Sequence, residues 1–313
     1  MTSEAERRVI DGTSWAELCD ALKNAGQIIL DPAHPADPLT RAEGFRYLSR
    51  LMRAALQTFV EHADPRAPVL QRVVHETAKM GADNPDIVYA NAALSGEHRY
   101  RIHGRRGTVR YISFSTQIGH YGKGAGMPPT GQIDTSTLDV RPDGTFEIFL
   151  ARERPAPLEP GQNHLPMTAE TGTLIVRQVR LRPDEVLADL AIERIGGDPR
   201  PAPLTAELLD QGFQSAGQLV NGAAMLFSAW TKMFQEHVNA LPRFDQELSN
   251  RFGGLADIAY YHSYWRLEDD EALVVDATPP PCDHWNFQVN NHWMESLDYR
   301  YFKIHTNSAT AKP

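Results

Sequence analysis

Imidazole and carboxamide side chains alternate with aromatic ones in the run DHWNFQVN, residues 283 to 290. Side chains on a β-strand point alternately to its two faces. One face of such a strand is expected to be core and carries Asp283, Trp285, Phe287 and Val289. The other carries uncharged polar groups that both donate and accept hydrogen bonds, namely His284, Asn286, Gln288 and Asn290. Groups of this kind suit the lining of a semi-enclosed pocket.

Two other runs have the same alternation. In TVRYISFSTQIG, residues 108 to 119, one face carries Tyr111, Ser113, Ser115 and Gln117. In DIAYYHSYW, residues 257 to 265, Tyr260, His262 and Tyr264 alternate with Tyr261, Ser263 and Trp265. Three strands with uncharged polar faces could line one cavity. The alternative is a set of buried hydrogen-bonding networks between sheets, or exposed faces of low charge.

The histidines in these runs supply candidates for acid-base chemistry. His262 and His284 could act as general acid or base, because imidazole titrates near neutral pH. Asp86, in GADNPDIVYA, could add a carboxylate, although this stretch also has the composition of a turn. At each histidine the alternative is a structural role satisfied by hydrogen bonds.

A further group of residues could hold or wall a substrate. The candidates are Tyr111, Ser113, Tyr261, Trp265, Trp285, Asn286, Gln288 and Trp293. The strand rule places Trp285 opposite His284, so these side chains cannot all face one site.

A metal site is an alternative use of the same histidines. His262, His284, His292 and Glu295 have the ligand types of a zinc or iron site, but the spacing of His284 and His292 matches no short motif. We therefore expect no metal or organic cofactor, with a transition metal as the alternative. The glycine-rich stretch GKGAGMPPTG opens no predicted helix, which disfavours phosphate binding there.

The predicted elements change from helix to strand and back along the chain. Residues 14 to 80 have helical spacing, including a short helix over 68 to 80. From Asn84 the period becomes two, which predicts the strands IVYANAAL, HRYRIHG, TVRYISFSTQI, STLDVR, TFEIFLAR and TLIVRQVRL. Residues 203 to 240 return to helix in two pieces, and at least three strands follow from Ile258 to about His305.

This order predicts an α+β fold: an antiparallel β-sandwich or jelly-roll-like core with N-terminal helices and an inserted helical pair. We divide the chain into an N-terminal helical segment, 1 to 80, and a sandwich domain, 81 to 313, with its helical insertion at about 203 to 241. The helix over 214 to 240 carries several Gly and Ala residues. These could pack against a second subunit in a homo-oligomer or equally well within the chain.

Composition restricts the class of protein. Hydrophobic residues make up 42% of the chain and charged residues 23%, as in ordinary globular proteins. Lys plus Arg number 31 against 40 Asp plus Glu, with no basic stripe, which disfavours nucleic-acid binding. There is no signal-peptide pattern and no apolar stretch of membrane-spanning length. We expect a cytoplasmic protein that does not bind a membrane and has a small-molecule partner.

Three segments together resemble the bacterial DUF1214 family, which often occurs beside a DUF1254 domain: ADNPDIVYANAALSGEHRYRIHG (82 to 104), GTLIVRQVRL (172 to 181) and HWNFQVNNHWMESLDYRY (284 to 301). The resemblance implies a jelly-roll-like sandwich with attached helices and brings no reaction or catalytic residue. His164 stands where such proteins often carry Trp in an Asn-Trp-Leu-Pro element. Members commonly continue past the equivalent of His305, so a C-terminal tail could be missing here or present as a separate chain.

Three functions follow from these residues. The first is a cofactor-free enzyme that acts by general acid-base chemistry on a small, largely apolar or hydroxylated metabolite. The second is a non-catalytic binding protein for a hydrophobic metabolite. The third is a His-ligated metalloenzyme of cupin-like type.

Overall fold

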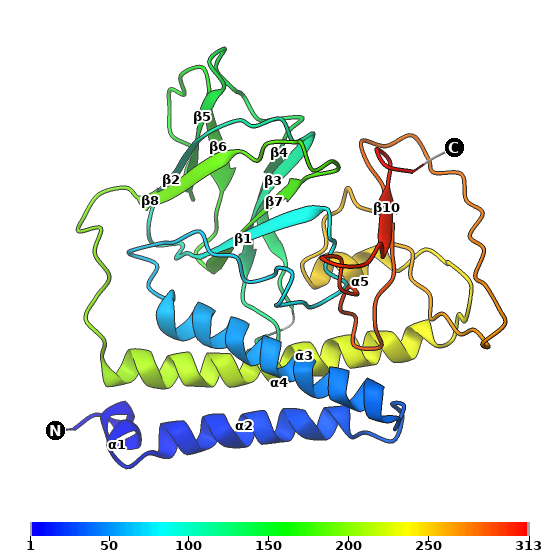
Figure 1. The fold of residues 1–313 in the computed structure, drawn as a ribbon. Coiled ribbons are helices and arrows are strands. Elements are labelled where there is room, and N and C mark those ends of the chain that lie inside the picture. The colour runs from blue at the N-terminus through cyan, green and yellow to red at the C-terminus, as the bar shows by residue number, and fades with distance from the viewer. Residues whose placement is uncertain (1, 125, 312–313) are drawn as a thin grey trace.

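The computed structural model describes residues 2–124 and 126–311. Four helices form one layer of the molecule (Figure 1): α1 (Glu4–Ile10), α2 (Thr13–Ile29), α3 (Pro38–Leu56) and α4 (Ala206–Phe234). Three of these helices have N-cap residues: the side chains of Ser3, Asp37 and Thr205 accept hydrogen bonds from backbone N–H groups in the first turns of α1, α3 and α4. A π-helical turn, η1 (Gln57–Glu61), extends α3.

Helix α4 is continuous, although the sequence predicts two pieces. It is followed by a short helix, α5 (Gln246–Arg251). The small residues of α4 pack inside the chain: a Cβ on Gly217 would lie 2.9 Å from the Cβ of Ala21 in α2. Asn221 also donates to the Ala21 carbonyl at 2.8 Å. Contact between α2 and α4 thus explains these small residues. They no longer support a homo-oligomer, which stays a prediction.

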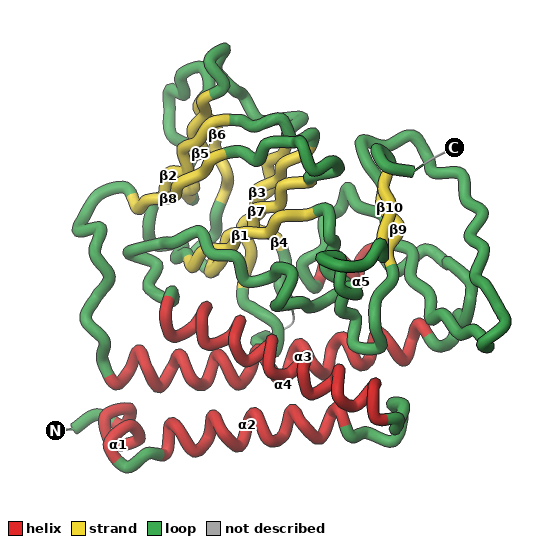
Figure 2. The backbone as a smooth tube through the Cα atoms, in the orientation of Figure 1, coloured by secondary structure: helices red, strands yellow, loops and turns green. Residues whose placement is uncertain are grey.

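Two four-stranded sheets pack above the helices (Figure 2). The first has the order β1-β7-β3-β4 and the second β6-β5-β2-β8. The strands are β1 (Ile87–Ala93), β2 (Tyr100–Arg105), β3 (Tyr111–Ile118), β4 (Pro129–Asp134), β5 (Thr145–Ala151), β6 (Gln162–Pro166), β7 (Thr171–Val179) and β8 (Asp189–Arg194). The α+β fold with a sandwich-like core and N-terminal helices, predicted from the sequence, is confirmed.

The facing sides of the two sheets form an apolar core. Phe114 of β3 and Phe146 of β5 meet edge to face with ring centroids 6.2 Å apart, among Ile102, Ile148 and Leu174. Because side chains alternate along each strand, the opposite face of the β1-β7-β3-β4 sheet points toward the helices and the C-terminal region. This opposite face is called the polar sheet face below.

The C-terminal region differs most from the prediction. Described residues after α5 form only two short strands, β9 (Asn286–Gln288) and β10 (His305–Asn307), which pair with each other apart from the main sheets (Figure 2). The predicted strand over 257 to 265 is wrong, because this segment makes only isolated bridges, Val238 with Tyr264 and Arg243 with Tyr261. Its side chains still largely alternate in burial: Tyr261 and Trp265 are exposed, whereas His262 stacks on Phe234 of α4.

Two more predicted elements are wrong. Residues 68 to 80 form no helix; instead Gln71 exchanges two backbone hydrogen bonds with Asn91, at 2.9 and 2.8 Å, beside strand β1. STLDVR, residues 136 to 141, forms a turn and loop. No helix among the described residues has the length and hydropathy to cross a bilayer. A cytoplasmic location stays a prediction.

Candidate functional site

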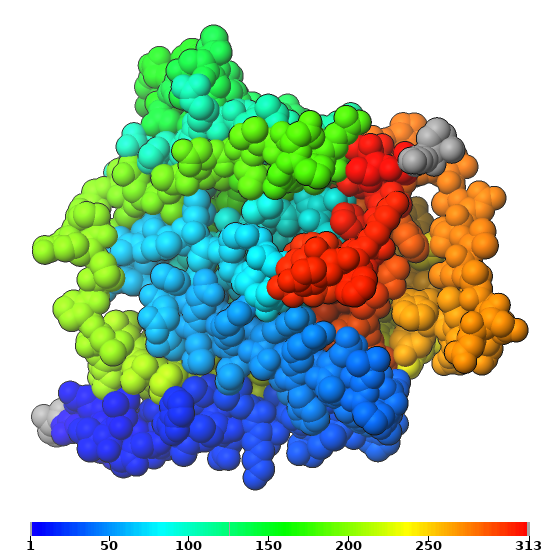
Figure 3. Space-filling view, in the orientation of Figure 1, coloured from blue at the N-terminus to red at the C-terminus, as the bar shows by residue number. Residues whose placement is uncertain are grey.

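A cavity of about 3370 Å³ lies between the polar sheet face, helix α4 and the C-terminal residues 249 to 292. Figure 3 shows this side of the molecule hollowed between the orange and red C-terminal segments. Ligand pockets usually measure about 300 to 1,000 Å³. The cavity is therefore larger than one small ligand requires, and its walls differ in chemistry.

The polar sheet face forms the floor. Cross-strand register places Tyr89 (β1), Arg177 (β7), Ser113 (β3) and Asp134 (β4) in one row across the four strands. Arg177 donates from Nη2 to the Gly253 carbonyl at 2.8 Å, whereas its buried Nη1 has no hydrogen-bond partner among the described residues. The Tyr89 hydroxyl accepts from the Asn84 backbone N–H at 3.2 Å. The floor thus presents a cation beside neutral hydrogen-bonding groups.

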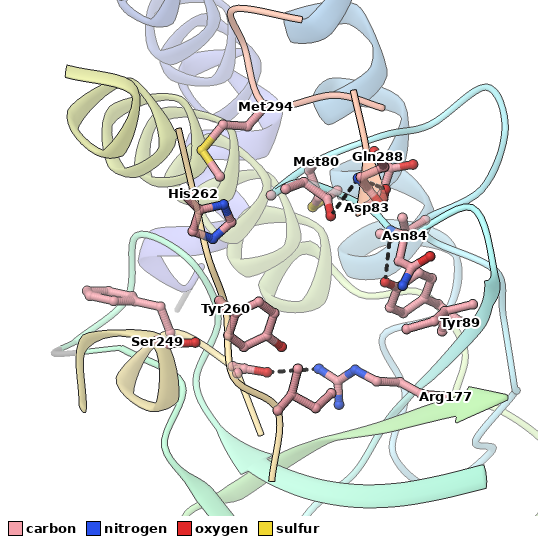
Figure 4. A pocket seen from close by; sticks show the side chains of 18 of the residues that line it. Met80, Asp83, Asn84, Tyr89, Arg177, Ser249, Tyr260, His262, Gln288 and Met294 are labelled. Atoms are coloured by element: carbon pink, nitrogen blue, oxygen red, sulfur yellow. Dashed lines mark hydrogen bonds between the residues drawn. The ribbon is translucent and has the colours of Figure 1, made fainter. Parts of the chain in front are cut away.

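Burial keeps the tyrosines around Arg177 neutral. It raises the pKa of Tyr121 to about 12 and raises the pKa values of Tyr89 and Tyr260, while the charge of Arg177 acts in the opposite direction on all three. At pH 7 these phenols are hydrogen-bond donors without charge. Figure 4 shows Tyr89, Tyr260 and Arg177 around one space.

The predicted polar row of β3 lies deeper than the cavity wall. Ser113, Ser115 and Gln117 are fully buried, and their side chains have no hydrogen-bond partner among the described residues. None of the three lines the cavity, so Ser113 is not placed as a substrate contact. Ser113 thus belongs to the floor's row of residues but does not reach the cavity surface.

Helix α4 and neighbouring residues form an apolar wall. It includes Met80, Trp230, Phe234 and Met294. His262 belongs to this wall: its ring stacks on Phe234 with centroids 4.6 Å apart and an interplanar angle of 22°. Burial lowers the pKa of His262 to about 4, so its imidazole is neutral at pH 7.

Of the other two predicted catalytic residues, His284 also lines the cavity and Asp86 does not. His284 lies against Tyr111, with ring centroids 5.4 Å apart, and burial lowers its pKa. Asp86 is buried and accepts hydrogen bonds from His305 Nε2 at 3.1 Å and Asn307 Nδ2 at 2.9 Å. No hydrogen bond joins His262, His284 and Asp86 among the described residues. They do not form a single acid-base group.

The four alternative metal ligands occupy separate environments. Both ring nitrogens of His292 are engaged, by His34 Nδ1 at 2.8 Å and the Tyr264 hydroxyl at 3.0 Å. Glu295 is fully buried and pairs with Arg50 at 2.5 Å. The part of the chain that the structure describes contains no group of three or more His, Cys, Asp or Glu side chains able to hold a metal ion.

Several predicted substrate contacts do line the cavity: Tyr111, Tyr261, Trp265, Trp285, Asn286 and Gln288. The carboxamide alternation is confirmed, since Asn286 donates to Gln288 at 2.9 Å and Gln288 to Asn290 at 2.8 Å. The prediction that the opposite face of this strand belongs to the core is wrong. Trp285, Phe287 and Val289 are only partly buried, and Asp283 is exposed. Trp293 lies outside the cavity, in the helical core, where its Nε1 donates to the Thr40 carbonyl at 2.8 Å.

Sequence reasoning missed Arg177. It is the only charged residue in TGTLIVRQV, the sequence of β7, and its neighbours Val176 and Gln178 are buried. A charged residue in the middle of an apolar central strand needs a specific environment. That signal was available, but the side chains around Arg177 come from strands and loops far apart in sequence.

Comparison with solved structures gives a strong match. An uncharacterised protein from Burkholderia cenocepacia is 46% identical, superposes with a TM-score of 0.92, and is matched over 98% of this chain and 84% of its own. A protein from Vibrio parahaemolyticus matches with 14% identity and a TM-score of 0.29, over 51% of this chain and 40% of that one. No protein-family model and no curated protein matches the chain.

Proposed function

Because the chain belongs to the same protein family as the uncharacterised Burkholderia cenocepacia protein, we propose a function from the cavity alone: the protein binds a small, largely apolar metabolite. Membership of the DUF1214 family is likewise a proposal. The observation that carries the binding function is the contrast between the cavity's walls. An apolar wall with Trp230, Phe234 and Met294 faces a polar floor with Tyr89 and Arg177.

This contrast matches the composition of small-molecule sites, where apolar and aromatic residues supply most of the surface and a few polar groups orient the ligand. The apolar wall provides the binding free energy, at about 25 cal/mol per Å² of apolar surface removed from water. The floor supports recognition of a polar head. We place binding ahead of catalysis because no hydrogen bond joins the candidate catalytic residues His262, His284 and Asp86 among the described residues, although both histidines line the cavity.

The binding function can be tested with N-phenyl-1-naphthylamine, a neutral dye that fluoresces in apolar surroundings. We expect saturable binding to the native protein. His262→Trp enlarges a side chain of the apolar wall and should weaken binding at least about tenfold, a change of 1.4 kcal/mol. His103→Trp is the control, because His103 is exposed on β2 and does not line this cavity. Equal binding by both variants, or no saturable binding, would refute the proposal.

Acid-base catalysis is the second candidate, and one observation favours it. The ring nitrogens of His262 have no hydrogen-bond partner among the described residues, and Figure 4 shows the ring beside Tyr260 and Met80. A neutral imidazole in that position can accept a proton, although a pKa of about 4 makes it a weak base.

Native mass spectrometry separates the two candidates. The native protein and His262→Gln would each be incubated with the small-molecule fraction of a cell extract, and the masses of bound and released molecules compared over time. If the native protein converts a molecule that His262→Gln holds unchanged, the protein is an enzyme. If both hold the same molecule unchanged, it is a carrier.

A further inference from the structure

We propose that the metabolite bound in the cavity carries a carboxylate, and that Arg177 binds this group. The inference rests on the proposed binding function and specifies its ligand class. It depends on the position of Arg177, on its lack of a carboxylate partner, and on the neutrality of the groups around it.

Arg177 lies at the floor of the cavity rather than at the rim. It occupies a central strand, β7, between β1 and β3, and lines the cavity together with Tyr89, Tyr260 and Gly253 (Figure 4). The apolar wall with Trp230 and Phe234 borders the same space. A ligand whose apolar part contacts that wall can therefore present its head group to the guanidinium.

Among the described residues, Arg41 and Arg106 also bond only to backbone carbonyls and keep a buried Nη1 without a partner, but neither lines the cavity, as Arg177 does. Two other partly buried arginines have carboxylate partners. Arg50 pairs with Glu295 at 2.5 Å, and Arg8 pairs with Asp210 at 3.1 Å. No carboxylate of the described residues lies within ion-pair distance of Arg177, whose only hydrogen bond here goes to a neutral carbonyl, that of Gly253. A guanidinium stays charged at any working pH, so its charge has no counterpart within this part of the chain.

The nearest acid on the same sheet face is already engaged. Asp134 stands in the same row but two strands away, which is about 10 Å at the usual strand spacing. Its Oδ1 accepts from the backbone N–H and the hydroxyl of Ser136 at 2.8 and 2.6 Å, and its Oδ2 accepts from Tyr111 at 3.5 Å. Asp134 therefore does not neutralise Arg177.

The unpaired Nη1 of Arg177 indicates which head group the ligand should carry. Buried Nη1 has no partner among the described residues, and a buried charged donor without an acceptor is costly. The surrounding phenols of Tyr89, Tyr121 and Tyr260 are neutral and do not supply a negative charge. An anionic oxygen would satisfy the donor and the charge together, as guanidinium–carboxylate pairs do.

One guanidinium matches one negative charge. The protein carries a net charge of -9; burial, and to a lesser extent the charges of Asp134 and Asp257, raise the pKa of Tyr111 to about 12. Arg177 is the one cation in the row of Tyr89, Arg177, Ser113 and Asp134, so a doubly charged phosphate placed there would be offset by a single positive charge. A monocarboxylate is the anion that fits.

The test uses ligands that share one chain and differ in the head group. Decanoate, decan-1-ol, decyl phosphate and decyltrimethylammonium would each displace bound N-phenyl-1-naphthylamine from the native protein. We expect decanoate to act at concentrations about 10 to 100 times lower than decan-1-ol, as hydrogen bonds to a charged group imply. Decyltrimethylammonium should be the weakest. Stronger displacement by decyl phosphate than by decanoate would overturn the carboxylate assignment.

Variants then assign the preference to a residue. Arg177→Gln should bring the ratio between decanoate and decan-1-ol to about one, while Arg177→Lys should keep part of it, since a lysine retains charge but not the planar fork. Arg110→Gln is the matched control, because Arg110 is exposed and lines the same cavity. Loss of the preference in Arg110→Gln instead of Arg177→Gln would overturn the assignment.

The outcomes separate this inference from the proposed function. If the dye binds and decanoate and decan-1-ol displace it equally, the binding function stands and the carboxylate inference falls. If the dye does not bind at all, both fall. Should Arg177→Gln fail to fold because the Gly253 contact is lost, the head-group series on the native protein and Arg177→Lys still decides.

Discussion

The imidazole of His262 lies nearly parallel to the ring of Phe234, with centroids 4.6 Å apart and an interplanar angle of 22°. The Tyr260 ring is also nearly parallel to that imidazole, at 6.0 Å and 7°. His262 is thus part of an aromatic stack, and its protonation is coupled to the stability of the fold.

His262→Phe should make the protein less sensitive to acid. The folded protein binds the His262 proton more weakly than the unfolded chain, with a pKa of about 4 against 6.5. Protonation of His262 therefore does not affect stability above pH 6.5, and below it favours the unfolded chain. By pH 4.5 the free energy of unfolding has fallen by about 2 to 3 kcal/mol through this residue. Phenylalanine preserves the stack without the titration. Urea unfolding of both proteins at pH 7 and 4.5 measures the difference; an unchanged pH dependence would contradict it.

Glu295→Gln should destabilise the protein by about 3 kcal/mol or more, because it leaves the Arg50 charge in a largely buried position without its partner. Glu295 is fully buried and also accepts from Asn291 Nδ2 at 3.0 Å. Glu43→Gln is the control, since Glu43 forms a longer contact, 3.5 Å, with the mostly exposed Arg46. Urea midpoints compare them, and equal losses in the two variants would show that the buried pair has no special importance.

Gly44→Ala and Gly26→Ala should have opposite effects. A Cβ on Gly44 would lie 2.7 Å from Ile29 Cγ2 and 2.8 Å from the Trp293 ring, whereas one on Gly26 would meet only Phe45, at 4.0 Å. Both positions are helical, where Ala is favoured over Gly by about 1 kcal/mol. We expect Gly26→Ala to raise the melting temperature and Gly44→Ala to lower it through overpacking. A higher melting temperature for both would show that Trp293 can move aside.

Asn307→Ala should loosen the β9-β10 ribbon. Asn307 Nδ2 donates to Asp86 at 2.9 Å and to the Leu181 carbonyl at 3.0 Å, both in buried positions. Removing the amide takes one of two donors from Asp86 Oδ1, which keeps His305 Nε2, and takes the side-chain donor from the buried Leu181 carbonyl, at a cost of about 1 to 3 kcal/mol. Faster hydrogen exchange of the β9 amides would report the effect. Thr306→Ala, at the neighbouring and partly exposed residue, should leave that exchange nearly unchanged.

The sequence revealed the strands whose side chains alternate strongly. β1, β2, β3, β5 and β7 were all predicted, because one face of each contributes to the apolar core. β4 begins with Pro129 and contains Gly131, and β6 is a short strand that pairs in parallel with β5. β8 has only partly buried and exposed residues. These three lack the local signals of a strand and form through pairing with neighbours.

The candidate site was only partly predictable for a related reason. Cavity-lining residues such as Tyr111, Asn286 and Gln288 were identified from alternation within one segment. Arg177 could not be, because its neighbours Tyr89 and Gly253 reach it only through strand register and a distant loop. In the segment 257 to 265 the alternation occurs without a sheet, so His262 lines the cavity from a loop rather than from the predicted strand.

The position of Trp293 bears on the order in which the chain is completed during synthesis. Trp293 fills the notch at Gly44 and donates to the Thr40 carbonyl at 2.8 Å, both in α3, and its ring centroid lies 4.9 Å from that of His34 in the loop between α2 and α3. Helices α2 and α3 leave the ribosome early, but the core that they share with α4 and Trp293 is complete only after residue 293 has been made. Their apolar faces wait first for α4 and then for Trp293, which makes this part of the nascent chain a suitable target for a chaperone that binds exposed apolar segments.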